Sequence, residues 1–139
     1  MIRLRHKKIL IIEDDLMLVR VYRCLLGMVG FQEIRHAVTG TNGLEIAKKW
    51  RPDLIISDML HPGLDGLTII EELSLHPTTL STRFIIISGC SIRNNLDYTE
   101  RARESGVYSC LEKPVNLRKF LRVVYKALAE VEEETRIGL

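Results

Sequence analysis

The sequence predicts an α/β protein, with five parallel strands in a doubly wound sheet and five helices that cover both faces of that sheet. Five predicted strands alternate along the chain with five predicted helices, and most of these helices carry apolar residues at helical spacing. The runs at residues 9–12, 54–57 and 84–87 are continuous and almost entirely apolar, which is typical of parallel strands buried on both faces. Because 139 residues can bury a core without disulfides, we expect one domain over residues 1–139, with a core at about 7–130 and a short charged C-terminal tail.

The first predicted strand covers residues 9–12 and the second covers residues 34–38. A helix lies between them, with Asp15 available as its N-cap and Gly30 as its stop. A further helix follows the second strand and is halted by Pro52, because the residue before a proline disfavours helical geometry. Both helices carry an apolar stripe, which indicates packing against the sheet.

The third strand, residues 54–58, delivers the single carboxylate of Asp58 to the carboxyl end of the sheet, and a turn rich in proline and glycine follows at once. The next helix is ended by Pro77. The fourth strand, residues 84–88, again ends in a polar residue, Ser88.

The last part of the chain begins with a short, very polar helix over residues 95–105, which has little to bury. A fifth strand over residues 107–111 runs into Lys113. Asn116 can then cap a long final helix with a marked apolar stripe.

Composition excludes several classes of function. Hydrophobic residues at 46% and charged residues at 27% are ordinary for a globular protein, so we expect no membrane insertion. A net charge of +2 is too small to favour direct binding of nucleic acid. The three cysteines form neither CxxC pairs nor an even set, which favours a reducing cytoplasm.

Polar residues at the strand ends predict a phosphoryl site. The carboxyl ends of parallel strands meet at one edge, so Glu13, Asp14, Asp58, Ser88 and Lys113 can converge. Three crowded carboxylates repel one another unless a cation joins them, and oxygen ligands of this kind suit Mg²⁺. A carboxylate nucleophile, a divalent cation, an ammonium and a hydroxyl can hold a phosphoryl group, which predicts an aspartyl phosphate on Asp58. Alone, Asp58 would be read as a turn or cap residue.

With these residues the chain resembles the receiver domain of two-component response regulators, in its chemotaxis-type, single-domain form. The intervals match the family: 44 residues separate Asp14 from Asp58, 30 separate Asp58 from Ser88, and 25 separate Ser88 from Lys113. The matching positions are residues 9–14, Asp58, Pro62, Asp65, Gly66, Ser88, Gly89, Gly106, Lys113 and Pro114.

The resemblance implies a flavodoxin-like strand order, 2-1-3-4-5, and a bound Mg²⁺. Asp14, Asp58 and the backbone carbonyl of Leu60 would ligate the ion, and Glu13 would act through water. The donor of the phosphoryl group would be a histidine kinase or a histidine phosphotransfer protein. The phosphorylated chain would change its binding to a downstream protein target or an output domain, and a homodimer is also allowed.

The resemblance also assigns roles around the phosphoryl group. Lys113 would pair with it, Ser88 would donate a hydrogen bond to it, and the Lys113–Pro114 peptide would be cis. Cys110 stands where the family usually has a Tyr or Phe that moves on activation, so we expect the readout in residues 89–105 instead.

Other singled-out residues have structural interpretations. His61 is expected to be a turn residue, Trp50 to pack its helix, and Asp15 and Asp65 to be cap or turn residues. The cysteines are expected to be small buried hydrophobes. Leu60 and Cys90 offer no strong polar group to orient an attacking water, which predicts a long-lived phosphorylated state.

Four classes of function stay open on the sequence. The preferred one is a phosphorylated switch that is not a turnover enzyme, with nothing after the last helix to form an output domain. The second is an unphosphorylated interaction module of the same fold. The third is a phosphatase, which Leu60 disfavours because no acid stands two residues beyond Asp58. The fourth is a receiver cut from a larger regulator or hybrid kinase.

Overall fold

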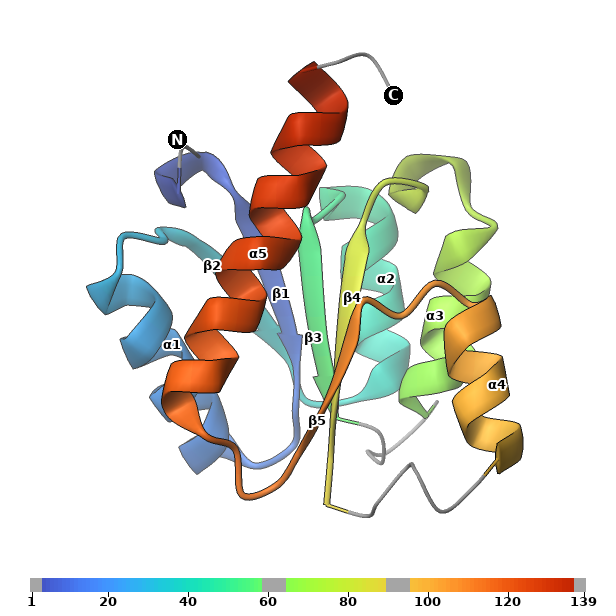
Figure 1. The fold of residues 1–139 in the computed structure, drawn as a ribbon, viewed down its shortest axis with the longest axis horizontal. Coiled ribbons are helices and arrows are strands. Elements are labelled where there is room, and N and C mark those ends of the chain that lie inside the picture. The colour runs from blue at the N-terminus through green and yellow to red at the C-terminus, as the bar shows by residue number, and fades with distance from the viewer. Residues whose placement is uncertain (1–3, 59–64, 90–95, 137–139) are drawn as a thin grey trace.

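The computed structural model describes residues 4–58, 65–89 and 96–136, and its five strands form one parallel sheet. The strand order is β2-β1-β3-β4-β5, as expected (Figure 1). The strands are β1 (Lys8–Ile12), β2 (Glu33–Ala37), β3 (Leu54–Asp58), β4 (Arg83–Ser88) and β5 (Ser109–Glu112).

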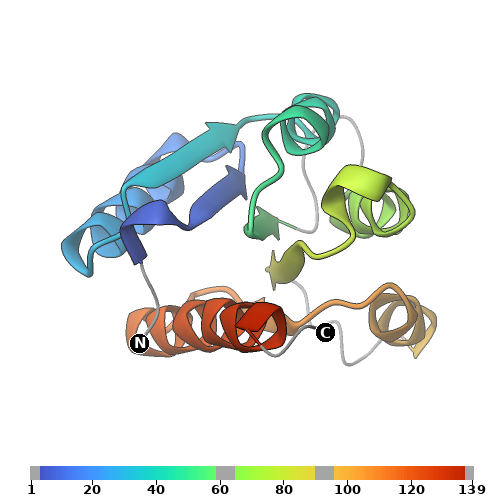
Figure 2. The same ribbon diagram turned by 90° about the horizontal axis from the view of Figure 1, so that it is seen from above.

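Helices cover both faces of the sheet, with α1 and α5 on one face and α2 and α3 on the other (Figures 1 and 2). α4 lies beside α3, and an ion pair between Arg101 and Glu71 joins the two. The helices are α1 (Leu16–Met28), α2 (Gly40–Trp50), α3 (Gly66–Ser74), α4 (Leu96–Glu104) and α5 (Leu117–Arg136), with short 3-10 turns η1 (Leu4–His6) and η2 (Pro77–Thr79).

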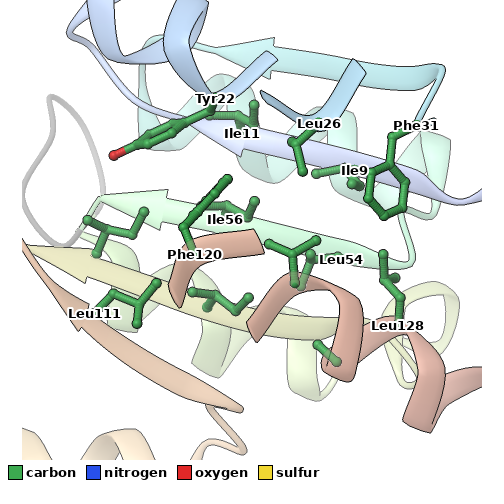
Figure 3. Close-up of a cluster of buried hydrophobic side chains, with 14 of the residues drawn as sticks. Ile9, Ile11, Tyr22, Leu26, Phe31, Leu54, Ile56, Leu111, Phe120 and Leu128 are labelled. Carbon is green, nitrogen blue, oxygen red and sulfur yellow. The ribbon is translucent and has the colours of Figure 1, made fainter. Parts of the chain in front are cut away.

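The sheet separates two apolar clusters, because successive strand residues point to opposite faces. Ile9 and Ile11 of β1 face α1 and α5, whereas Leu10 and Ile12 face α2 and α3. Figure 3 shows part of the first cluster, which includes Val19, Tyr22, Leu26, Phe120, Val124, Ala127 and Leu128 from the two helices. The buried aliphatic runs of the central strands β1, β3 and β4, packed between two helical layers, hold the ends of these strands and the polar residues there in fixed positions.

Short polar side chains begin the helices as predicted. Asp15 accepts hydrogen bonds from the backbone N–H groups of Met17 and Leu18 at the start of α1, and Asp65 accepts one from Thr68 at the start of α3. Each cap satisfies backbone donors that lack a partner inside the helix. The prediction that these two aspartates are cap residues is confirmed.

The chain turns at the ends of the helices also follow the sequence. Gly30 has a φ of 114°, a left-handed conformation that glycine adopts at little cost after α1. α2 ends at Trp50, two residues before Pro52, and Asn116 accepts a hydrogen bond from the N–H of Lys119 in the first turn of α5. These three expectations are confirmed.

The predicted start of the fifth strand is wrong by two residues. We expected residues 107–111, but β5 covers Ser109–Glu112. The N–H of Val107 donates to the carbonyl of Ala102 at 3.1 Å and so still belongs to the end of α4. Gly106, with a φ of 82°, turns the chain there.

The expectation that the cysteines are buried is wrong for the two that lie in the described residues. Cys24 is exposed because it lies on the side of α1 opposite to buried Val19, Tyr22 and Leu26. Cys110 is exposed on the edge strand β5, next to buried Leu111, which points to the other face of the sheet. Cys90 lies outside the described residues.

Trp50 packs, as predicted. Its half-buried ring contacts the apolar cluster under α2, and the guanidinium carbon of Arg35 lies 4.5 Å from the ring centre. A cation this close to an aromatic face adds a modest attraction to the packing.

Gly43 and Gly27 give a matched test of how tightly α2 packs against Ile12 at the end of β1. A Cβ at Gly43 would lie 2.4 Å from Cδ1 and 2.8 Å from Cγ1 of fully buried Ile12, whereas a Cβ at Gly27 has nothing within 4 Å. We expect Gly43→Ala to lower the free energy of unfolding by about 1–3 kcal/mol. Gly27→Ala should raise it by about 0.5–1 kcal/mol, because alanine favours a helix more than glycine does. The same gain applies at Gly43, but there the contact with Ile12 outweighs it. Urea unfolding measures both values, and a fully stable Gly43→Ala would contradict the packing argument.

Candidate functional site

The ends of two strands, β1 and β3, bring three acidic side chains together at the carboxyl edge of the sheet. Ile12 of β1 lies opposite Ser57 of β3, so Glu13 and Asp58 come next to each other one residue later. One carboxylate oxygen from each of Glu13, Asp14 and Asp58 lies within 4.8 Å of the other two. The structure therefore places the three predicted metal-binding acids in one cluster.

The next two strands contribute a hydroxyl and an ammonium. Ser88 ends β4, where it lies opposite Glu112 of β5, and Lys113 follows directly. The backbone N–H of Lys113 donates to the carbonyl of Ser88 at 2.8 Å. The Lys113–Pro114 peptide is cis, as the resemblance implied.

The acids differ in exposure. Glu13 is 2% exposed and Asp58 is 9% exposed, whereas Asp14 is exposed to solvent. One oxygen of the Glu13 carboxylate accepts a hydrogen bond from the N–H of Asp15 at 3.1 Å, and Ser88 is 1% exposed. Glu13, Asp58 and Ser88 therefore form the buried part of the cluster, and Asp14 is its solvent-exposed acid.

Lys113 joins the two buried carboxylates. Its Nζ lies 3.2 Å from Oδ2 of Asp58 and 3.4 Å from Oε2 of Glu13. One ammonium is thus shared by two carboxylates, and Asp14 adds a third negative charge nearby. The cluster has an excess of negative charge, which favours a further cation.

The electrostatics of Glu13 and Lys113 reflect this arrangement. Burial raises the pKa of Glu13, and the charge of Asp58 adds to the rise, while the Asp15 N–H and the Lys113 ammonium oppose it. Burial disfavours the ammonium of Lys113, but its hydrogen bond to Asp58 and the charges of Asp58 and Glu13 outweigh that effect and raise its pKa. Lys113 therefore stays charged at neutral pH.

The residues present fit Mg²⁺. The cluster offers carboxylate oxygens, which are the ligands that this hard cation prefers, and one of the three acids faces solvent, where the ion can keep bound water. The predicted fourth ligand, the backbone carbonyl of Leu60, lies outside the described residues, as do His61 and Cys90. Of the predicted readout segment, the structure describes Gly89 and residues 96–105.

Sequence reasoning missed Tyr22 as a neighbour of this site. Its position in the sequence is that of a residue in the apolar stripe of α1, and in the structure it is 1% exposed in the core. Yet burial, followed by the charges of Glu13, Asp58 and Asp15, raises the pKa of Tyr22 to about 12. The sequence signal that could have indicated this position is a tyrosine among leucines and valines, about two helical turns after the acidic pair Glu13 and Asp14.

Comparisons with known proteins agree with the geometry. The model of the response regulator receiver domain family matches residues 9–125. The polar-differentiation response regulator DivK of Brucella anthropi is 25% identical over 124 residues, which cover 89% of this chain and 98% of that protein.

Two solved structures have the same fold. A CheY-like response regulator receiver domain protein from Methanospirillum hungatei is 26% identical, with a TM-score of 0.81, and the match covers 92% of this chain and 98% of that one. A response regulator receiver domain protein from Clostridium thermocellum is 28% identical, with a TM-score of 0.78 and coverage of 91% and 97%. Within the described residues, no helix is both long and apolar enough to cross a membrane.

Proposed function

The chain belongs to the response regulator receiver domain family of two-component signalling, and from that premise we propose that it accepts a phosphoryl group on Asp58 and thereby changes its binding to a partner. The observation that carries the proposal is the contact of the Asp58 carboxylate with the Lys113 ammonium inside a cluster of acids. A structural aspartate at a strand end needs no such surroundings.

The proposed reaction is a transfer between two side chains. An oxygen of Asp58 attacks the phosphorus of a phosphohistidine, the P–N bond breaks, and the imidazole leaves with its bonding electron pair and takes up a proton. The ammonium of Lys113 offsets negative charge on the transferred phosphoryl group, and the hydroxyl of Ser88, which ends the neighbouring strand, donates to it. Both groups act by position and charge.

Mg²⁺ is the cofactor we propose. Glu13, Asp14 and Asp58 would hold it, and when bound it would neutralise charge on the phosphoryl oxygens. The protein's own contribution is to keep these oxygens close together on the rigid ends of β1 and β3.

We propose a stoichiometric switch rather than a turnover enzyme. The residue two beyond Asp58 is Leu60, which cannot act as a general acid or base for repeated hydrolysis. The partners proposed are a histidine kinase or histidine phosphotransfer protein as donor and a downstream protein or output domain as receiver of the signal.

The test is phosphoryl incorporation. We expect acetyl phosphate with Mg²⁺ to add one phosphoryl group per chain, seen by intact mass spectrometry, and peptide mapping should place it on Asp58. EDTA should suppress the adduct, because the acids then repel the incoming phosphate. Incorporation at another residue, or none with Mg²⁺ present, would refute the proposal.

A further inference from the structure

Tyr22 carries a buried hydroxyl that has no hydrogen-bond partner among the described residues. Its ring stacks on Phe120, with ring centres 4.9 Å apart and an angle of 23° between the planes. Leaving a buried donor without a partner costs about 1–3 kcal/mol, whereas a phenylalanine would fill the same space without that cost. The packing of the core therefore gives no reason for this hydroxyl.

The hydroxyl points toward the edge of the sheet at which the acids lie (Figure 3). In Figure 3 the oxygen of Tyr22 extends in the direction of the strand arrowheads, toward the carboxyl edge of the sheet. Besides burial, the charges that act on it are those of Glu13, Asp58 and Asp15, with Glu13 the strongest. With a pKa of about 12, the phenol is protonated at neutral pH and can donate.

Glu13 needs a new donor when the site is filled. In the present state one oxygen of its carboxylate accepts from the N–H of Asp15 and the other accepts from Lys113. A divalent cation among the acids repels the ammonium of Lys113, and a phosphoryl group on Asp58 attracts it away. Mg²⁺ or its bound water would take one acceptor site of the Glu13 carboxylate, which is 2% exposed, but the site that Lys113 has left would lack a buried donor to fix the side chain.

We propose that Tyr22 is a positioning residue of the phosphoryl site, whose hydroxyl donates a hydrogen bond to the Glu13 carboxylate, directly or through one water, once Lys113 has left it. This inference rests on the proposed function, because it needs a cation or a phosphoryl group at the cluster. Tyr22 would hold Glu13 in one orientation in the filled state and would make no such bond in the empty state.

Tyr22→Phe tests the proposal, because it removes the hydroxyl and keeps the ring that stacks on Phe120. We expect Mg²⁺ to bind about tenfold more weakly to this variant than to wild type, measured by titration of backbone amide chemical shifts. In metal-free buffer the variant should unfold at the same urea concentration as wild type or at a higher one, because the hydroxyl has no partner to lose there. Tyr125→Phe is the control, since it removes a phenol hydroxyl from an exposed position on α5.

The outcomes separate this inference from the proposed function. Equal Mg²⁺ affinity in wild type and Tyr22→Phe would overturn the inference and leave the proposed function standing. A marked loss of stability of Tyr22→Phe in metal-free buffer would also overturn it, because the hydroxyl would then serve the empty fold. If wild type itself does not bind Mg²⁺, the metal site and the inference both fail.

Discussion

Asp58→Asn is expected to abolish phosphoryl incorporation from acetyl phosphate completely, without loss of the fold. The amide has the shape of the carboxylate but lacks the charged oxygen that attacks phosphorus. Asp58 is 9% exposed, its Oδ2 lies 3.2 Å from Nζ of Lys113, and it is the single acid of β3. The free energy of unfolding in metal-free buffer should not fall, because one ammonium then faces one buried carboxylate instead of two.

Asp15→Asn is the matched control for that experiment. Asp15 is an exposed acid at the same edge, one residue beyond the acidic pair, and its side chain caps α1. Asparagine caps helices about as well, so the control removes one negative charge and little else. We expect Asp15→Asn to accept phosphate like wild type. Equal loss in both variants would mean that general charge at this edge, rather than the Asp58 carboxylate, governs the reaction.

The sequence was enough to predict the sheet and the acids because both depend on short-range signals. Continuous aliphatic runs identify buried parallel strands, and a polar residue directly after such a run must emerge at the carboxyl edge. Glu13, Asp58 and Ser88 all follow this rule, and the structure places each of them at that edge.

The sequence was not enough where a side chain's environment depends on a second element. The exposure of Cys110 depends on which face of β5 it occupies and on β5 being an edge strand. The general preference of cysteine for the interior therefore gave a wrong prediction at this position. The environment of the Tyr22 hydroxyl depends on Phe120 of α5, which stacks on the tyrosine ring, and on the charges of Glu13 and Asp58 at the ends of β1 and β3. The sharing of one ammonium by Glu13 and Asp58 likewise needs coordinates.

Lys113→Met is expected to lower the free energy of unfolding in metal-free buffer by about 2–3 kcal/mol, because it removes the cation from two buried carboxylates and leaves their charge uncompensated. The matched control is Lys48→Met, which breaks the exposed pair of Lys48 and Glu72 at 3.5 Å and should cost less than about 0.5 kcal/mol. Urea unfolding of the two variants gives the comparison, and equal losses would show that Lys113 acts as an ordinary surface charge.

The effects of Mg²⁺ and pH on stability test whether the loss of unfolding free energy in Lys113→Met arises from the acidic cluster. Mg²⁺ should stabilise Lys113→Met more than wild type, because the ion no longer competes with an ammonium for Glu13 and Asp58. In wild type the pKa of Lys113 lies above the ordinary 10.5, so its stabilisation is fully present below that pH and is lost as the pH rises through the raised value. The difference in unfolding free energy between wild type and Lys113→Met should therefore be constant around neutral pH and shrink in alkali. A difference that persists unchanged in alkali, or one that Mg²⁺ leaves intact, would mean that the methionine acts through packing and not through the missing charge.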